Sequence, residues 1–156
     1  MSTNQEGTSV EELCRELEGV EAPGTDGGAE QSRSKEVVAE ATEPLAVDGL
    51  FGFDEELVKE SLDGLLLVLI SLGDEGTHGK RLMNDLSDVF GVRLSPGTVY
   101  PRLHGLEDEG LLEVHELVRT KEYRIADEAE VRRRIGSVLE QHLALWAVFE
   151  TALGDL

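Results

Sequence analysis

Apolar residues are unevenly distributed along the chain, and their pattern predicts where ordered structure begins. Residues 1–49 are rich in Gly, Glu, Ser and Thr and contain few apolar side chains. Such a segment buries too little apolar surface to offset its conformational entropy, so we predict a disordered acidic extension. Order is expected from Phe51. The unbroken apolar run 65–70 indicates a buried helix, which we expect to begin at Asp54 as its N-cap and to continue to Leu72.

Two shorter helices are predicted next. The first has Thr77 as its expected N-cap and ends by Gly91, and its apolar positions recur at helical spacing: Leu82, Leu86, Val89 and Phe90. The second has Ser95 as N-cap, Pro96 at the first helical position and Gly110 after its end. Its buried stripe is expected to consist of Val99, Leu103 and Leu106.

The pattern then changes from helical spacing to alternation. Residues 112–117 alternate between apolar and polar, as a half-buried strand does, and 119–121 form a short polar turn. Tyr123 and Ile125 continue the alternation in a partner strand, which predicts a two-stranded hairpin. Asp127 is the expected N-cap of a long final helix.

Three helices followed by a β-hairpin and a long helix predict a winged helix-turn-helix, a fold that is mainly α with a small β-hairpin wing. We expect residues 50–127 to form this DNA-binding domain and residues 128–156 to form a C-terminal dimerisation helix. The final helix has an apolar stripe too wide for so small a domain to cover, so a homodimer is predicted. The expected dimer contacts are Ile135, Val138, Leu145, Trp146 and Phe149.

A winged helix reads duplex DNA with the start of its third helix, where backbone N–H groups and short hydroxyls face phosphates and base edges. The candidate DNA-binding residues at this helix are Arg93, Ser95, Gly97, Thr98, Tyr100 and Arg102, and those at the hairpin turn are Arg119 and Lys121. Two interpretations stay open for Tyr100, DNA contact and packing against the hairpin. The same holds for the arginines at 132–134, which are either a further cationic cluster or a solvated face.

The motifs in this region resemble the PadR family of transcriptional regulators. They are the apolar segment 64–69, His78-Gly79, the stretch LSPGTVYP at 94–101, LEDEGL at 106–111 and Tyr-Arg-Ile at 123–125. The resemblance covers roughly residues 62–127. It implies a repressor that binds pseudo-palindromic DNA as a dimer, with Ser95, Gly97, Thr98 and Tyr100 in the DNA-reading helix. Some family members bind flat apolar drugs near the position of Trp146, which implies a small apolar effector as a further partner.

The chain departs from the family pattern at three positions. Lys80 stands where the family usually has an aromatic residue after His-Gly. Glu122 replaces the first of two adjacent aromatics in the second wing strand, and Ala126 stands where Thr is usual. These differences concern the packing and contacts of the wing.

The formal net charge is −19, which by itself opposes attraction to polyanionic DNA. The charge is uneven, however. Residues 1–60 contain 16 acidic and 4 basic residues, a net charge of −12, whereas residues 78–134 contain 11 acidic and 10 basic residues, a net charge of −1. The second stretch is therefore the locally basic part of an acidic protein. Many carboxylates and few lysines are typical of microbes with a very salty cytoplasm, so we predict a halophilic source.

The sequence gives little evidence for a secreted protein, a membrane protein or an enzyme. The N-terminus has no apolar signal region and no apolar run is long enough to span a membrane, so a cytoplasmic location is predicted. The single cysteine, Cys14, cannot form an internal disulfide. No phosphate-binding loop, nucleophile elbow or metal-ligand spacing occurs, so we expect no catalytic residue, metal or cofactor. The alternative functions are a winged-helix module that binds protein, and a drug-responsive regulator with an apolar ligand site at the dimer interface.

Overall fold

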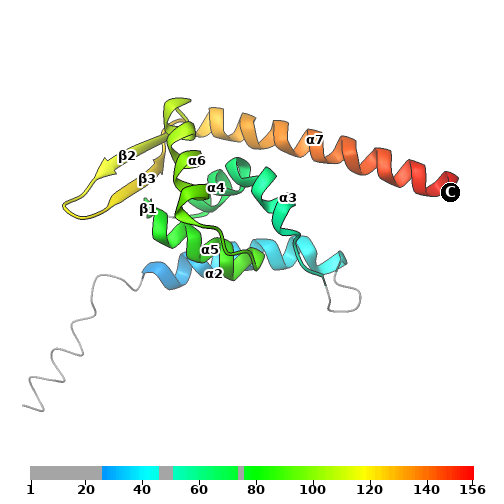
Figure 1. Ribbon diagram of the computed structural model, residues 1–156, viewed down its shortest axis with the longest axis horizontal. Coiled ribbons are helices and arrows are strands. Elements are labelled where there is room, and N and C mark those ends of the chain that lie inside the picture. The colour runs from blue at the N-terminus through cyan, green and yellow to red at the C-terminus, as the bar shows by residue number, and fades with distance from the viewer. Residues whose placement is uncertain (1–25, 46–50, 74–75) are drawn as a thin grey trace, which may run out of the picture.

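The computed structural model describes residues 26–45, 51–73 and 76–156 (Figure 1). Its helical part comprises α2 (Asp26–Thr42), η1 (Glu43–Leu45), α3 (Glu55–Glu60), α4 (Leu62–Leu72), α5 (Gly79–Phe90), α6 (Pro96–Asp108) and α7 (Glu128–Asp155). The strands are β1 (Thr77–His78), β2 (Leu112–Glu116) and β3 (Lys121–Ile125). This is a winged helix-turn-helix with a long C-terminal helix, as predicted. None of the described helices is long and apolar enough to cross a membrane.

The first predicted helix is divided in two. Asp54 is its N-cap as expected, because the carboxylate accepts a hydrogen bond from the backbone N of Leu57 at 3.0 Å. The helix does not run unbroken to Leu72, since Ser61 leaves helical geometry with φ −90° and ψ 7°. The break places Ser61 Oγ 3.3 Å from Nε2 of His142 on α7. The two residues are 81 positions apart, so no local residue pattern could predict this contact.

The predicted N-cap at Thr77 is wrong. Thr77 and His78 instead form strand β1, in which Thr77 pairs with Tyr123 and His78 with Glu122. The sheet therefore has three antiparallel strands in the order β1-β3-β2, and not only the two of the hairpin. Helix α5 begins at Gly79, one residue after the start that an N-cap at Thr77 would give. The chain leaves it through Gly91, as expected, and the left-handed φ of +69° explains the glycine there.

The start of α6 and the start of α7 agree with the sequence signals. Ser95 has extended geometry before Pro96 at the first position of α6, and Gly110 follows the helix with φ +77°. At α7, the Asp127 carboxylate accepts a hydrogen bond from the backbone N of Glu130 at 3.0 Å. Strands β2 and β3 pair from Leu112 opposite Ile125 to Glu116 opposite Lys121, which makes the predicted hairpin.

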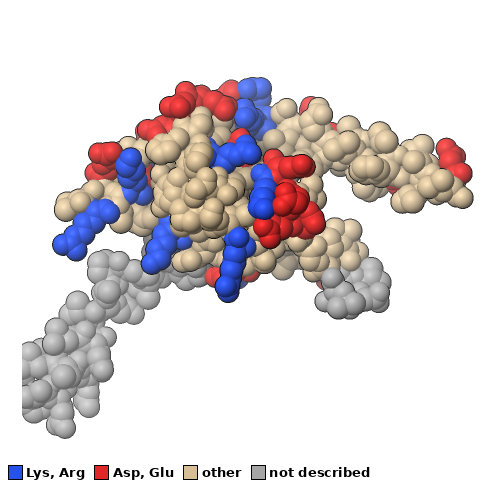
Figure 2. Space-filling model, in the orientation of Figure 1, with Lys and Arg blue, Asp and Glu red and all other residues tan. Residues whose placement is uncertain are grey.

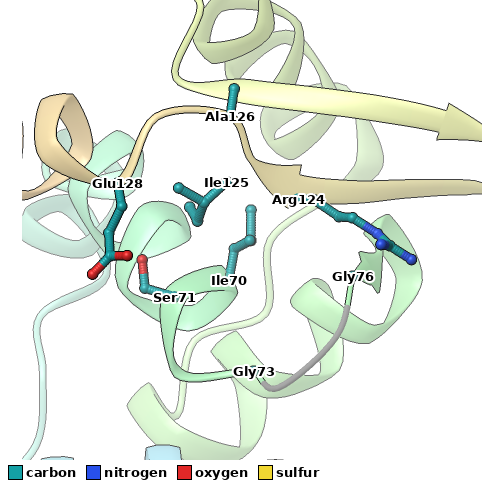
Figure 3. A pocket seen from close by; sticks show the side chains of 8 residues that line it. All are labelled: Ile70, Ser71, Gly73, Gly76, Arg124, Ile125, Ala126 and Glu128. Carbon is teal, nitrogen blue, oxygen red and sulfur yellow. The ribbon is translucent and has the colours of Figure 1, made fainter.

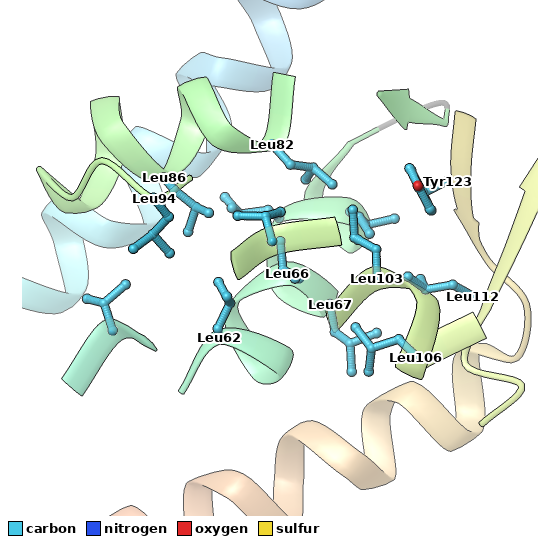
Figure 4. Packing of buried hydrophobic residues seen from close by; sticks show 14 of the residues in the cluster. Leu62, Leu66, Leu67, Leu82, Leu86, Leu94, Leu103, Leu106, Leu112 and Tyr123 are labelled. Atoms are coloured by element: carbon cyan, nitrogen blue, oxygen red, sulfur yellow. The ribbon is translucent and has the colours of Figure 1, made fainter. Parts of the chain in front are cut away.

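The hydrophobic core surrounds α4, whose apolar run is buried because other elements cover nearly all of its sides (Figure 4). Helix α4 contacts α5, α6, α7 and β3. The fully buried side chains come from α4, α5, α6, the segment at the start of β2, and β3: Leu62, Leu66, Leu67, Leu82, Leu86, Val99, Leu103, Leu106, Leu111 and Tyr123. The core therefore fixes α6 and the hairpin relative to one another.

Part of the predicted disordered extension is a packed helix. Helix α2 contacts α4 and α5, Ser34 is buried, and Val38 packs against the core. The prediction for residues 1–49 is therefore wrong for residues 26–45. Their composition contains few apolar side chains, and the contacts that hold the helix come from elements distant in sequence. Residues 1–25, with Cys14, and 46–50 lie outside the described residues.

Deleting residues 1–45 is expected to lower the free energy of unfolding by about 1–3 kcal/mol, because it removes the apolar contacts of α2 with the core. Chemical denaturation measures the change. A chain that lacks only residues 1–25 is the matched control, since it retains α2. Equal stability of the full chain and the chain that lacks 1–45 would show that α2 contributes nothing to the fold.

Candidate nucleic-acid interface

Helix α6 presents its first turn to solvent. Its Val99, Leu103 and Leu106 are buried against the core at i, i+4 and i+7, which turns the opposite side outward. Ser95 and Gly97 are exposed. The hydroxyls of Ser95 and Thr98 lie 3.1 Å apart, and the Ser95 side chain makes no capping bond to the helix backbone. Short polar groups therefore stand at the exposed end of the helix.

The four predicted cationic contacts differ in their partners. A nitrogen of Arg102 lies 3.5 Å from a carboxylate oxygen of Asp63 on α4, and Lys121 Nζ lies 3.5 Å from Glu116 on β2. Arg93 and Arg119 have no ion pair with any residue in the described part of the chain. All four side chains are exposed.

Basic side chains are spread over this face of the molecule, and acidic ones are more clustered. Figure 2 shows Lys and Arg side chains spaced from the hairpin across the middle of the domain. Asp and Glu gather along the upper edge and near α3, and some of them lie beside basic side chains. A protein with a net charge of −19 thus has a face on which basic groups are spread out. This is the electrostatic requirement for contact with a phosphate backbone.

Tyr100 packs against the start of α5. A Cβ added to Gly79 would lie 2.6 Å from both Cε1 and the hydroxyl oxygen of the Tyr100 ring, so the ring fills the space that a side chain would need. The ring is half-buried. Tyr100 therefore positions α6 on α5, and a direct contact with DNA stays a prediction.

Gly79→Ala is expected to destabilise the fold by about 1–3 kcal/mol, because the Tyr100 ring or the start of α5 has to move. Gly105→Ala is the matched control. No atom lies within 4 Å of the position of its Cβ, and Ala is the better helix former, so it should be neutral or stabilising. Thermal unfolding compares the two variants. If the cost of Gly79→Ala is unchanged in a Tyr100→Ala background, the ring is not the cause.

The arginines at 132–134 are paired with carboxylates. Arg132 lies 3.4 Å from Glu128, Arg133 pairs with Glu130, and Arg134 lies 2.8 Å from Glu109. The Arg133 hydrogen bonds lower the pKa of Glu130 below its ordinary value. These pairings favour a solvated face over a free cationic cluster.

An apolar groove of about 320 Å³ lies between α3, α4 and α7. Phe53, Leu57, Leu65, Val68, Ile135 and Leu139 are among its lining residues. Gly64 faces α7, and a Cβ there would make an ordinary van der Waals contact with Val138 at 3.6 Å.

The apolar stripe of α7 continues beyond this groove into solvent. From Leu139 to the end every residue is exposed, and the helix extends past the body of the domain (Figure 1). Of the predicted dimer contacts, Ile135 and Val138 are half-buried against their own domain. The other three are 56% (Leu145), 63% (Trp146) and 64% (Phe149) exposed.

A second hollow, of about 570 Å³, lies behind the hairpin between the end of α4 and the start of α7 (Figure 3). Its charged lining residues have partners, because Arg124 pairs with Glu122 and Glu128 pairs with Arg132. Within the described ranges, no group of three or more His, Cys, Asp or Glu residues could hold a metal ion.

Sequence reasoning missed three residues on the candidate interface. Asp63 was not included because its partner, Arg102, is 39 positions away. Lys80 lies at the exposed start of α5, and His104 is exposed on α6. The departure of Lys80 from the family pattern was the one available signal, and it pointed to packing of the wing and not to charge.

The family model and the curated relatives that match this chain are all described as transcriptional regulators. Residues 66–134 match the model of the transcriptional regulator PadR-like family. The chain is similar to the transcriptional activator GvpE1 of Halobacterium salinarum, with 41% identity over 108 residues, which are 69% of this chain and 56% of the relative. It is also similar to the transcriptional activator GvpE of Haloferax mediterranei, with 50% identity over 74 residues, 47% of this chain and 38% of the relative.

The chain thus spans about half the length of the curated relatives it matches. Among solved structures, it is similar to a transcriptional regulator from Clostridium thermocellum, with a TM-score of 0.48, 17% identity, and coverage of 67% of this chain and 97% of the other. The matched family and the curated relatives are transcriptional regulators and not enzymes, so the enzyme class is set aside.

Proposed function

Residues 66–134 of this chain form a transcriptional regulator domain of the PadR-like family, and on that premise we propose that the chain regulates transcription by binding duplex DNA as a two-fold dimer. The observation that carries the proposal is the shared face of α6 and the hairpin. Ser95, Gly97 and Thr98 stand at the exposed end of α6, and Arg93 and Arg119 are exposed and unpaired among the described residues. Hydroxyls and N–H groups then meet base edges, and the cations meet phosphates.

Helix α7 is the proposed dimerisation element. Its exposed apolar stripe is too large for solvent contact in a stable monomer, and the apolar groove beside α3 and α4 offers a complementary surface. A second copy of the chain covers both when its α7 packs antiparallel along the first. Two α6 helices related by a two-fold axis select a pseudo-palindromic site with half-sites about one helical turn, or a multiple, apart.

The direction of regulation is proposed to be activation. The curated relatives that share 40–41% identity with the chain are named transcriptional activators. The resemblance to the PadR family implies a repressor, whereas the names of these relatives favour an activator. A reporter gene placed behind a bound site decides between them, because deletion of an activator lowers expression and deletion of a repressor raises it.

Selection of duplexes from a random library, followed by fluorescence anisotropy, tests DNA binding. Arg93→Ala and Arg119→Ala are each expected to weaken binding about 10-fold, since each removes one unpaired cation. Arg133→Ala on α7 is the matched control and should bind as the parent chain does, because Arg133 is paired with Glu130. If no duplex is selected, the proposal is wrong, and the protein-binding module is the alternative to test. No observation on the described residues favours a small apolar effector over a second copy in the groove.

A further inference from the structure

A groove separates α6 from the hairpin and ends at the start of α5. Its volume is about 550 Å³. Its lining includes Lys, Arg and His side chains from three elements: His78 and Lys80 at the start of α5, His104 on α6, and Arg119 and Lys121 on the hairpin. The groove therefore lies between the two elements proposed to contact DNA.

The groove is basic in an otherwise acidic protein. Lys80, Arg119 and Lys121 line it together with a single carboxylate, that of Glu116, which lies 3.5 Å from Lys121 Nζ. Lys80 and Arg119 have no ion pair with a described residue. Two unpaired cations on opposite sides of a concave surface attract an anion that can accept hydrogen bonds from several directions.

The wall of the groove includes a buried tyrosine. Tyr123 lines the groove and is 1% exposed, yet its hydroxyl makes no hydrogen bond within the described chain. Burial raises the pKa of Tyr123 and keeps its hydroxyl protonated. Because that oxygen is fully buried, Tyr123 forms part of the groove wall, and contact with a ligand falls to the exposed Lys80 and Arg119.

The start of α5 adds backbone donors. His78 occupies the N-cap position without a side-chain capping bond. Its Nδ1 lies instead 3.2 Å from the carbonyl oxygen of Lys121, which requires Nδ1 to donate and joins the helix start to the hairpin. The first N–H groups of this 12-residue helix therefore have no side-chain cap, and Gly79 and Lys80 at the helix start line the groove.

From these observations we propose that the groove binds a phosphate group, with Lys80 as its principal ligand and Arg119 on the opposite side. The source of the phosphate is either the DNA backbone, in which case the inference rests on the proposed function, or a free phosphate-bearing molecule. The backbone source fits the geometry, because the groove lies between α6 and the hairpin, the two elements proposed to contact DNA. Lys80 stands where an aromatic residue is usual in the family, so the site belongs to this chain's own sequence.

Lys80→Ala tests the site against Lys59→Ala, a control on α3 whose ammonium is held by Glu55 and Glu56. With the selected duplex, Lys80→Ala should weaken binding about 5–10-fold regardless of base sequence. It should also reduce the magnitude of the slope of log K against log salt by about 1. Replacing the duplex phosphates one at a time with neutral methylphosphonates identifies the contact. At one phosphate in each half-site, the neutral replacement should weaken binding by the parent chain and leave binding by Lys80→Ala unchanged.

Titration of the free protein with inorganic phosphate distinguishes the second source. A free phosphate ligand is assigned if the amide NMR shifts of Gly79 and Lys80 saturate in the parent chain and vanish in Lys80→Ala. In that case no methylphosphonate position should distinguish the parent chain from Lys80→Ala. If the protein selects a duplex but shows neither coupling nor saturable shifts, the phosphate site is wrong and the proposed function stands. If no duplex is selected, the proposed function is wrong, and the inorganic phosphate titration alone decides the site: saturable shifts support it and their absence overturns it.

Discussion

Replacing both Leu145 and Phe149 with Glu is expected to convert the chain from a dimer to a monomer. Both side chains are more than half exposed in the single chain, at 56% and 64%. In the proposed dimer they become buried against the second copy, where an apolar side chain contributes about 1.5–3 kcal/mol and an unpaired carboxylate costs several more. The stability of the domain itself should change little, because neither residue packs against its own core.

Light scattering at several protein concentrations measures the mass of the particle. Val148→Glu is the matched control, since Val148 is 63% exposed on the same helix but points about 140° away from Ile135 at 100° per residue. It should remain dimeric. The double variant should also lose DNA affinity by on the order of 100-fold, because a monomer brings one α6 to the duplex where a dimer brings two. A double variant that stays dimeric would show that α7 is not the interface.

Binding of the selected duplex is expected to depend only weakly on KCl up to molar concentrations. Ordinary repressors lose affinity steeply, since each cation that contacts a phosphate releases a counterion. In this chain Arg102 lies 3.5 Å from Asp63 before any DNA is bound. When Arg102 turns to a phosphate, the Asp63 carboxylate is left near the DNA and takes up a cation. Uptake and release then partly cancel, and we expect a log–log slope of magnitude below about 2.

Asp63→Asn separates this mechanism from a general effect of the acidic surface. The variant frees Arg102 and removes the uptake, so it should bind more tightly at low salt and have a slope steeper by about 1. Glu140→Gln on the exposed part of α7 removes the same charge away from α6 and should leave the slope unchanged. A steep slope in the parent chain, or equal slopes in both variants, would place the carboxylates outside the interface. It would also remove the physical argument for adaptation to a salty cytoplasm.

The sequence by itself determined the winged order of the elements, because the signals involved are local. The carboxylates of Asp54 and Asp127 cap the helices they precede, Pro96 begins α6, and Gly91 takes the left-handed φ that ends α5. Each effect acts within about one helical turn. The buried stripe of α6 likewise follows from spacing alone, and with it the direction in which Ser95 and Gly97 face.

Contacts between distant parts of the chain decided the rest. Thr77 looks like a helix cap locally, but hydrogen bonding to Tyr123 makes it a strand. Helix α2 has too polar a composition to be predicted, and its packing on α4 and α5 supplies the free energy that the composition lacks. The pairing of Arg102 with Asp63 and the closure of the groove around Lys80 depend on side chains that only the folded core brings together. The sequence therefore determined which side of α6 is exposed, whereas the tertiary structure decided which charged side chains around α6 are paired and which are free.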